Sequence, residues 1–416
     1  MIYILGRQPA IGLAEIESLY GSENLQPVGY FAVDVNSDKE FNFKRIGGAL
    51  KVAKKLTTLE TTEWKEVQKH LKTASTEHAR RLPEGKLKLG ISTYGLKVSP
   101  SKITALGLEL KKSIRGSGRS VRLVPNGETA LNSAQVLHNK LTSELGWELL
   151  IIKNGSSTII AQTTAVQDID AYTLRDRGRP KRDARVGMLP PKLAQTIINI
   201  AAAAVSPVFP EDSAFPAERG DTNMKLEPSE SYGKTGGIRL LDPFCGTGVV
   251  LQEAALMGYS VYGTDIDERM IRYSRDNLNW LSETHKISFD WYLHEGDATD
   301  TKWQKPIDIV ACEGYLGRPF TSAPSSEILQ KTINDCDTIL RKFLKNIAGQ
   351  TKKGDRMCIA VPAWFVGSNI YHLKTLDQLT DLGYNRISFV HSNEKDLIYH
   401  RDGQVVGREL LVISRK

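Results

Sequence analysis

The stretch LDPFCGTGVVLQEA, residues 241–254, decides the fold because it joins a short strand to a helix through a glycine turn. Asp242 ends the expected strand, and Gly246 and Gly248 flank one threonine before the helix begins. Glycines permit this tight turn and let a ligand approach the backbone. In open α/β sheets, ligands bind beyond the carboxyl ends of the strands, where this turn lies. The stretch therefore predicts a ligand site.

Expected strands and helices alternate from residue 238 to the C-terminus. This alternation predicts an α/β fold with a mostly parallel sheet and helices on both faces, and the final hairpin predicts one antiparallel edge strand. The expected strands include IRLLDP, YSVYGTD, IDIVAC, RMCIAVP and ELLVIS, and the expected helices begin near residue 248 and span 267–282, 326–347 and 372–381.

The front of the chain divides into smaller expected parts. Residues 1–60 predict a small α/β unit that includes a helix near 43–56, and residues 61–168 predict a second unit with a hairpin turned at Asn154-Gly155. Residues 169–191 form a basic connector, and residues 192–416 form the C-terminal domain. The segment 206–237 contains four prolines and many polar residues, which predicts a flexible surface insertion.

Composition limits the classes of function. The chain has 416 residues, 40% hydrophobic and 25% charged, which is typical of a folded protein with two or three domains. We expect no membrane span and no secretory signal, and therefore a cytoplasmic protein. The four cysteines form no CxxC pair, so we expect no disulfide framework and no metal site.

Charge is distributed unevenly along the chain. Residues 1–192 hold 30 Lys and Arg against 19 Asp and Glu, whereas residues 193–416 hold 25 against 29. This distribution favours a polyanion-binding front half joined to a slightly acidic back half. A lysine-rich solvated surface is the alternative interpretation.

Three acidic residues follow successive expected strands of the C-terminal domain: Asp242, Asp265 in YGTDID and Asp297 in HEGDAT. Leu251 stands where a dinucleotide-binding turn needs glycine or alanine, and no Gly-Lys-Ser/Thr follows as in a P-loop. Carboxylates suit a cationic sulfonium better than a phosphate, so we expect S-adenosyl-L-methionine as cofactor. The candidate cofactor-binding residues are Asp242, Phe244, Gly246, Gly248, Asp265, Ile266, Asp297 and Ala298.

The segments DPFCGTG, YGTDID and GDAT resemble class I methyltransferases that modify guanosine in tRNA. With the segments at 2–21, 91–95, 106–112 and 163–201, the chain resembles the THUMP-containing tRNA guanosine-N2 methyltransferases that act on position ten. The resemblance implies a ferredoxin-like N-terminal domain, a THUMP domain directed at the tRNA 3′ end, and a Rossmann-like methyltransferase domain acting on a flipped base. It also implies tRNA as partner and allows a small zinc-binding activator subunit.

The connector and the stretch DIVACEGYLGRPF (308–320) supply the other candidates. In the connector, Arg175, Arg177, Arg179, Lys181 and Arg182 are expected to contact the RNA backbone; alternatively, they form ion pairs with Asp176 and Asp183. By order and spacing, residues 313–317 (EGYLG) resemble the family's Asp-Pro-Pro-Tyr-Gly loop, which holds the amine to be methylated. The resemblance makes Glu313, Gly314 and Tyr315 the candidate catalytic residues.

The departures from the family loop leave alternatives open. Both prolines are lost, and Leu316 stands where the tyrosine is expected, so Tyr315 or Phe320 would have to stack on the base. A DNA amine methyltransferase and a catalytically weak protein that binds both S-adenosyl-L-methionine and tRNA are the alternative functions. Cys312 could be a nucleophile, but an inert core cysteine is favoured.

Overall fold

The computed structural model of the chain describes residues 1–183, 188–203 and 237–416, which form two compact units. The first unit comprises residues 1–13, 20–44 and 48–171, and the second comprises residues 14–19, 45–47 and 172–416. The flexible insertion expected at 206–237 lies outside the described residues except for its last residue.

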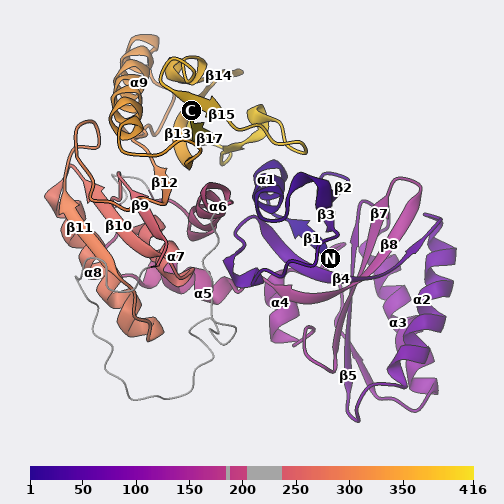
Figure 1. Cartoon of the computed structure of the whole chain (residues 1–416). Helices are drawn as coiled ribbons and strands as arrows, with labels where there is room; N and C mark the ends of the chain where they lie inside the picture. Colours follow the sequence, from indigo (N-terminus) through magenta and orange to yellow (C-terminus); the bar gives the residue numbers. More distant parts are fainter. Residues whose placement is uncertain (184–187, 204–236) are drawn as a thin grey trace. The chain divides into compact units, whose positions relative to one another are not determined.

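The first unit contains one eight-stranded sheet in the order β2-β3-β1-β4-β8-β7-β5-β6 (Figure 1). Strands from the expected 1–60 and 61–168 segments share this sheet through the antiparallel pairing of β4 with β8. Side chains of α2 and α3 pack with Leu89 and Ile91 of β5 in a buried cluster. The elements of the chain up to residue 168 are β1 (Ile2–Leu5), α1 (Pro9–Tyr20), β2 (Leu25–Val28), β3 (Ala32–Val35), β4 (Ala49–Leu59), α2 (Trp64–Ala79), β5 (Leu87–Tyr94), α3 (Pro100–Gly116), β6 (Val121–Leu123), α4 (Ser133–His138), β7 (Gly146–Asn154) and β8 (Ser157–Val166).

Two predictions for this unit have opposite outcomes. The hairpin of β7 and β8 is confirmed, with Gly155 at φ 60° in the turn. The helix expected near 43–56 is wrong, because residues 49–59 form strand β4 between β1 and β8. Ala49, Val52 and Ala53 are spaced as on one face of a helix, and pairing on both sides overrides that local pattern.

The second unit is built on a nine-stranded mixed sheet whose main path is β11-β10-β9-β12-β13-β17-β15 (Figure 1). The pairings from β11 to β13 are parallel, and β17 is antiparallel to both β13 and β15. The elements of the chain from residue 169 on are α5 (Ile169–Thr173), α6 (Pro191–Ala202), β9 (Arg239–Asp242), α7 (Val249–Leu256), β10 (Ser260–Asp265), α8 (Glu268–His285), β11 (Trp291–Glu295), β12 (Ile309–Glu313), α9 (Ser326–Ala348), β13 (Arg356–Val366), β14 (Asn369–Tyr371), β15 (Tyr384–Arg386), β16 (Ile398–Tyr399) and β17 (Val406–Arg415).

This topology confirms the α/β class and corrects one detail. The closing strand β17 is antiparallel as expected, but it lies inside the sheet, so it is not an edge strand. The chain leaves β9 toward β10 and β11 on one side and returns to β12 on the other side. The strand order therefore reverses between β9 and β12, which is where ligands bind in sheets of this type.

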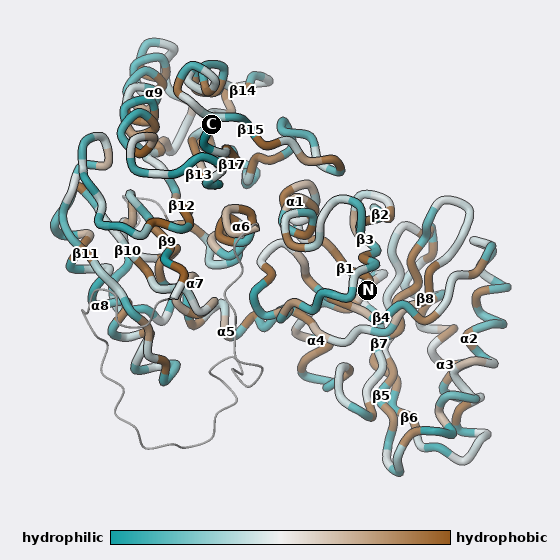
Figure 2. The backbone as a smooth tube through the Cα atoms, in the orientation of Figure 1, coloured by the Kyte–Doolittle hydropathy of each residue, from teal (hydrophilic) through white to brown (hydrophobic). Residues whose placement is uncertain are grey.

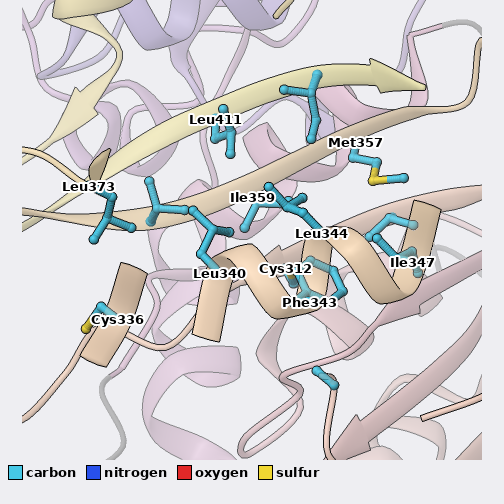
Figure 3. Close-up of a cluster of buried hydrophobic side chains, with 14 of the residues drawn as sticks. Cys312, Cys336, Leu340, Phe343, Leu344, Ile347, Met357, Ile359, Leu373 and Leu411 are labelled. Atoms are coloured by element: carbon cyan, nitrogen blue, oxygen red, sulfur yellow. The ribbon is translucent and has the colours of Figure 1, made fainter. Parts of the chain in front are cut away.

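Helix α9 supplies much of the core of the second unit. Figure 3 shows Leu340, Phe343 and Leu344 of α9 facing Ile359 of β13 and Leu411 of β17. The intervening strand residues Ala360 and Leu410 are also buried, so both faces of these strands are covered. The tube is brown, that is hydrophobic, over α6 and mostly teal or white over α8 (Figure 2). Every α6 residue from Pro191 to Ala202 except Lys192 is buried.

The helix expected at 372–381 is wrong. Residues 374–377 form a single 3₁₀ turn, and Leu373, Leu376 and Leu379 are buried in the α9 core. Their spacing of three residues fits the 3₁₀ repeat rather than the 3.6-residue repeat of an α-helix. In the ranges that the structure describes, no helix combines the length and the apolar character that crossing a membrane requires.

Candidate functional site

A cavity of about 840 Å³ lies at the carboxyl ends of β9, β10 and β12 in the second unit. Its wall contains most of the residues that the sequence singles out. From the expected cofactor set it includes Asp242, Phe244, Gly246, Asp265, Ile266, Asp297 and Ala298, and from the expected catalytic set it includes Glu313, Gly314 and Tyr315. Gly248 is absent from the wall that the described residues form.

The three strand-end aspartates share one local arrangement. The Oδ1 atom of each accepts the backbone N–H of the residue two positions later, from Phe244 at 3.1 Å, from Asp267 at 3.0 Å and from Thr299 at 2.8 Å. A short acidic side chain favours such a bond to its own backbone. Each aspartate therefore holds its own loop in place, and its other lone pairs remain available to a ligand in the cavity.

The two glycines of the turn serve different purposes. Gly246 has φ 51°, and a Cβ atom there would meet no protein atom within 4 Å. Its N–H is donated to Asp265 Oδ2 at 2.9 Å. Gly248 has φ 80°, and a Cβ atom there would lie 2.9 Å from Ser274 Oγ of α8. Gly246 thus keeps space beside the cavity wall, whereas Gly248 lets α7 and α8 approach closely.

The electrostatic character of the cavity follows from burial of its carboxylates. Burial raises the pKa of Asp242 well above its ordinary value, and nearby Asp265 and Glu313 raise it further. Burial also raises the pKa of Asp265, although backbone N–H donors from Asp267 and Gly246 oppose the shift. Burial in a cluster of like charges disfavours the ionised forms. A cationic ligand would relieve this cost, so the cavity favours positive charge.

Glu313 has a cationic partner that its local sequence does not reveal. Arg408 of β17 donates its Nε–H to Glu313 Oε1, and both side chains are largely buried. Burial raises the pKa of Glu313, and the Arg408 cation opposes that shift. Arg408 also lines the cavity. The candidate catalytic carboxylate is therefore one half of an ion pair at the cavity wall.

The rest of the loop after β12 is placed by hydrogen bonding and packing. Gly314 donates its N–H to the carbonyl oxygen of Ala360 at 2.9 Å, which extends the pairing of β12 with β13. Tyr315 is 47% exposed, and it lines the cavity together with Leu316 and Phe320. Both aromatic rings considered for stacking on a base are thus at the cavity.

Cys312 belongs to the core. It is fully buried among the side chains that pack with α9 (Figure 3), and burial raises its thiol pKa well above the ordinary value. A thiol that resists ionisation is a poor nucleophile. The expectation that Cys312 lies in the core is confirmed.

The basic residues of the connector fall into two classes, buried and accessible. Arg175 and Arg179 are 5% and 3% exposed. Arg175 Nε donates to Glu253 Oε1 of α7 at 2.7 Å, and Gln195 of α6 donates to Glu253 Oε2 at 2.9 Å. Protein encloses the guanidinium groups of these two arginines as they lie here, and the phosphate contact expected of them stays a prediction. Arg175 joins the connector to α6 and α7.

Arg177, Lys181 and Arg182 remain at least partly accessible. The alternative interpretation pairs these cations with Asp176 and Asp183. Lys181 pairs instead with Asp276 of α8, whose carboxylate lies 3.5 Å from the Lys181 Nζ atom. Asp183 instead lies 3.5 Å from Arg269. The Lys181 backbone exchanges hydrogen bonds of 2.9 Å with Asn277, which also donates to the carbonyl oxygen of Thr247. Asn277 thus ties the connector to the glycine turn.

Some residues of the cavity wall were missed by sequence reasoning. Met188 and Leu189 of the connector line it, as do Thr338, Ile339 and Lys342 of α9 and residues 401 and 404–406 before and at the start of β17. Arg318, Lys342 and Arg401 are exposed cations of this wall. No local motif marks these positions, since tertiary packing brings them to the strand ends. Arg408 directly precedes Glu409 and the apolar run LLVI, and charged residues beside such a run were a signal for a buried ion pair.

Comparisons with known proteins agree with this geometry. A family model described as a methyltransferase domain matches residues 234–397. A probable tRNA (guanine(10)-N2)-dimethyltransferase of Methanothermococcus thermolithotrophicus is 33% identical over 115 residues, which cover 26% of this chain and 67% of the relative. This chain belongs to the tRNA (guanine(10)-N2)-dimethyltransferase family.

Two further similarities concern other members and the fold. The tRNA (guanine(10)-N2)-dimethyltransferase of Methanothermobacter thermautotrophicus is 33% identical over 130 residues, covering 31% of this chain. The match spans about a third of that relative's length, 34%. The crystal structure of TrmN from Thermus thermophilus matches with a TM-score of 0.50 at 14% identity, covering 100% of this chain and 99% of TrmN. The family member described here therefore has the class I methyltransferase fold.

Proposed function

We propose that the chain is an S-adenosyl-L-methionine-dependent tRNA methyltransferase that transfers a methyl group to the exocyclic amine of a guanosine. One observation carries the proposal: Glu313 and Gly314, on the acceptor side, line the same cavity as Asp242, Asp265 and Asp297. The names of the relatives in the family support tRNA as substrate and guanosine 10 as target.

The residues present fit S-adenosyl-L-methionine. This molecule carries a sulfonium cation, two ribose hydroxyls and an adenine amine, and the cavity offers carboxylates with raised pKa values. Ile266 lines the cavity and is 68% exposed, which is unusual for isoleucine and suits contact with an apolar ring face. We assign Asp265 to the ribose and Asp297 to the adenine amine, with Phe244, Gly246 and Ala298 completing the wall. The cofactor, when bound, supplies an electrophilic methyl group.

The acceptor side has to hold a weakly nucleophilic amine. The lone pair of an exocyclic amine is delocalised into the ring, so catalysis depends on orientation and on stabilising developing positive charge. The Glu313 carboxylate and the Gly314 carbonyl oxygen would accept the two N–H groups of the amine. Tyr315 or Phe320 would stack on the flipped base.

The basic part of the chain would hold the tRNA. We propose that residues 1–60 are the ferredoxin-like domain, 61–168 the THUMP domain and 169–191 the linker that leads to the methyltransferase domain. The charge excess of residues 1–192 supports this role. Lys51 does not contribute, because it is buried and pairs with Glu148. In the linker, Arg177, Lys181 and Arg182 are the proposed phosphate contacts.

The test is methyl transfer by the purified full-length chain. Wild type, Asp265→Ala and Glu313→Ala are incubated with tritiated S-adenosyl-L-methionine and tRNA, and the labelled nucleoside is identified by mass spectrometry. We expect N2-methylated guanosine with wild type and a loss of about a hundredfold or more with Glu313→Ala. Glu327→Ala, an exposed glutamate of α9, is the control. Labelling by the chain alone would show that the zinc-binding activator subunit is not required.

The same experiment separates the alternatives. Label in duplex DNA but not in tRNA would favour the DNA amine methyltransferase. Saturable binding of both cofactor and tRNA, without label in any tRNA, would favour the catalytically weak binding protein. Equal labelling by Glu313→Ala and wild type would show that Glu313 does not hold the amine.

A further inference from the structure

Arg408 reaches Glu313 by crossing a whole strand of the sheet. Glu313 of β12 is paired with Ala360 of β13, and Ala360 is paired with Leu410 of β17. Arg408 lies two residues from Leu410 and therefore on the same face of the sheet as Glu313. The ion pair is a built feature of three adjacent strands, and it holds both groups at the cavity wall.

The ion pair leaves hydrogen-bonding groups on both partners unused. Only Nε of Arg408 and Oε1 of Glu313 take part in it. Across the described ranges, neither Nη atom of Arg408 nor Oε2 of Glu313 has a hydrogen-bond partner. A buried guanidinium with five N–H donors normally satisfies most of them. Arg408 is 9% exposed, so its remaining donors are held in place beside the cavity rather than moving in bulk solvent.

We propose that Arg408 is a specificity-determining residue that donates a hydrogen bond to O6 of the target guanine while Glu313 accepts from its amine. This assignment rests on the proposed function. The Watson–Crick edge of guanine presents the N2 amine and N1–H as donors and O6 as an acceptor. A carboxylate beside a guanidinium offers acceptors and donors in the complementary order, and arginine is a frequent donor to guanine O6.

The ion pair also explains how the departure from the family loop is tolerated. Glu313 is one methylene longer than aspartate and is followed by glycine rather than proline, so its loop alone constrains it less. Arg408 restricts the carboxylate from the opposite side of β13. If Arg408 only positioned Glu313, its loss would slow all substrates alike. A direct bond to O6 predicts instead a change in the preference between bases.

The test compares two tRNAs that differ at one nucleotide. The first carries guanosine at the position methylated by wild type, and the second carries 2,6-diaminopurine there, which keeps the 2-amine but replaces O6 by an amine. We expect wild type to prefer guanosine by roughly tenfold to a hundredfold in kcat/KM. In Arg408→Met the preference should fall toward one, and Arg408→Lys should be intermediate. Any effect of the analogue on the tRNA itself cancels when these ratios are compared.

Arg401→Met is the matched control, because Arg401 also lines the cavity but is exposed and donates its Nε–H to the Tyr399 hydroxyl rather than to Glu313. Its ratio should equal that of wild type. The inference is overturned by a wild-type enzyme that uses both tRNAs equally, or by an unchanged ratio in Arg408→Met. If Arg408→Met transfers no methyl group at all, the guanosine preference of Arg408→Lys is compared with that of wild type. An equal preference in these two proteins then overturns the inference. A wild type that methylates no guanosine in tRNA defeats the proposed function itself.

Discussion

Gly246 donates its backbone N–H to the carboxylate of Asp265 at 2.9 Å, and this bond joins the turn after β9 to the end of β10. The second oxygen of the carboxylate accepts the N–H of Asp267 at 3.0 Å. One side chain thus fixes two loops of the cavity. The same side chain is the proposed partner of the ribose, so the shape of the site and its affinity depend on one residue.

Asp265→Asn should weaken cofactor binding by tenfold or more, because it removes the charge and one acceptor from a partly buried site. In the cofactor-free protein the lost hydrogen bond should cost about 1 kcal/mol of stability, and removal of a buried negative charge should oppose that loss. Isothermal titration calorimetry with S-adenosylhomocysteine measures the first effect, and urea unfolding measures the second. Asp381→Asn, an exposed change away from the cavity wall, should alter neither. Equal affinities of Asp265→Asn and wild type would contradict the assignment.

The two turn glycines should respond differently to alanine. Both have positive φ, so each substitution costs about 1–2 kcal/mol in backbone strain. Gly248→Ala adds a clash with Ser274 Oγ and should lower the unfolding midpoint more than Gly246→Ala does. Gly246→Ala should weaken binding of S-adenosylhomocysteine out of proportion to its loss of stability. Thermal unfolding and calorimetry on the same samples test the contrast, which the reverse order of either effect would contradict.

Arg175 should matter for stability rather than for RNA binding. Arg175→Ala leaves the buried Glu253 carboxylate without its cation, and losing one partner of a buried ion pair costs about 3–5 kcal/mol. Arg177→Ala, at an exposed position in the same segment, should change stability by no more than about 0.5 kcal/mol. Urea unfolding at constant pH gives both values. Similar stability for the two variants would show that the Arg175–Glu253 pair does not hold the connector.

The exposed cations of the connector should control the salt dependence of tRNA binding. Replacing Arg177, Lys181 or Arg182 by glutamine should weaken binding and reduce the slope of log affinity against log salt by about 0.7–1 for each lost phosphate contact. Filter binding of tRNA at several salt concentrations measures the slope. Lys286→Gln, in the C-cap of α8, is the control. Unchanged slopes for all three variants would remove the connector from the RNA-binding surface.

Methyl transfer should depend on pH through Glu313. Its carboxylate form is the one that accepts from the amine, and burial raises its pKa, so the rate should rise with pH through that pKa. The Arg408 cation opposes the shift, so Arg408→Met should raise the pKa of Glu313 and move the rising limb to higher pH. Single-turnover labelling between about pH 5 and 9 tests this. A limb that stays in place or moves to lower pH would contradict the role given to the ion pair.

The side of the cavity formed by the three aspartates was predictable because its residues are marked locally. Asp242, Asp265 and Asp297 each follow an expected strand, and parallel strands bring their carboxyl ends to one edge of a sheet. The glycine turn adds a second local mark. These features depend on short segments, so packing elsewhere in the chain does not change them.

The acceptor side and the connector depend on partners that are distant in the sequence. Arg408 reaches Glu313 only because β17 lies beside β13, and Arg175 is buried only because Glu253 of α7 receives it. The sequence of a run of basic residues is the same whether its side chains face solvent or a buried carboxylate, so the sequence alone does not distinguish the two cases. For the same reason β4 was predicted as a helix, since its pairing with β1 and β8 is not visible in its own spacing.

The measurement that tests the central claim most directly is calorimetric titration of the full-length protein with S-adenosylhomocysteine. If Asp242, Asp265 and Asp297 hold the methyl donor, titration of the wild-type protein should give a saturable heat signal that fits a single site. Asp265→Asn should require far more ligand to reach saturation. A folded wild-type protein that gives no saturable heat with S-adenosylhomocysteine or with S-adenosyl-L-methionine itself, at any temperature tried, would show that the cavity does not bind this cofactor.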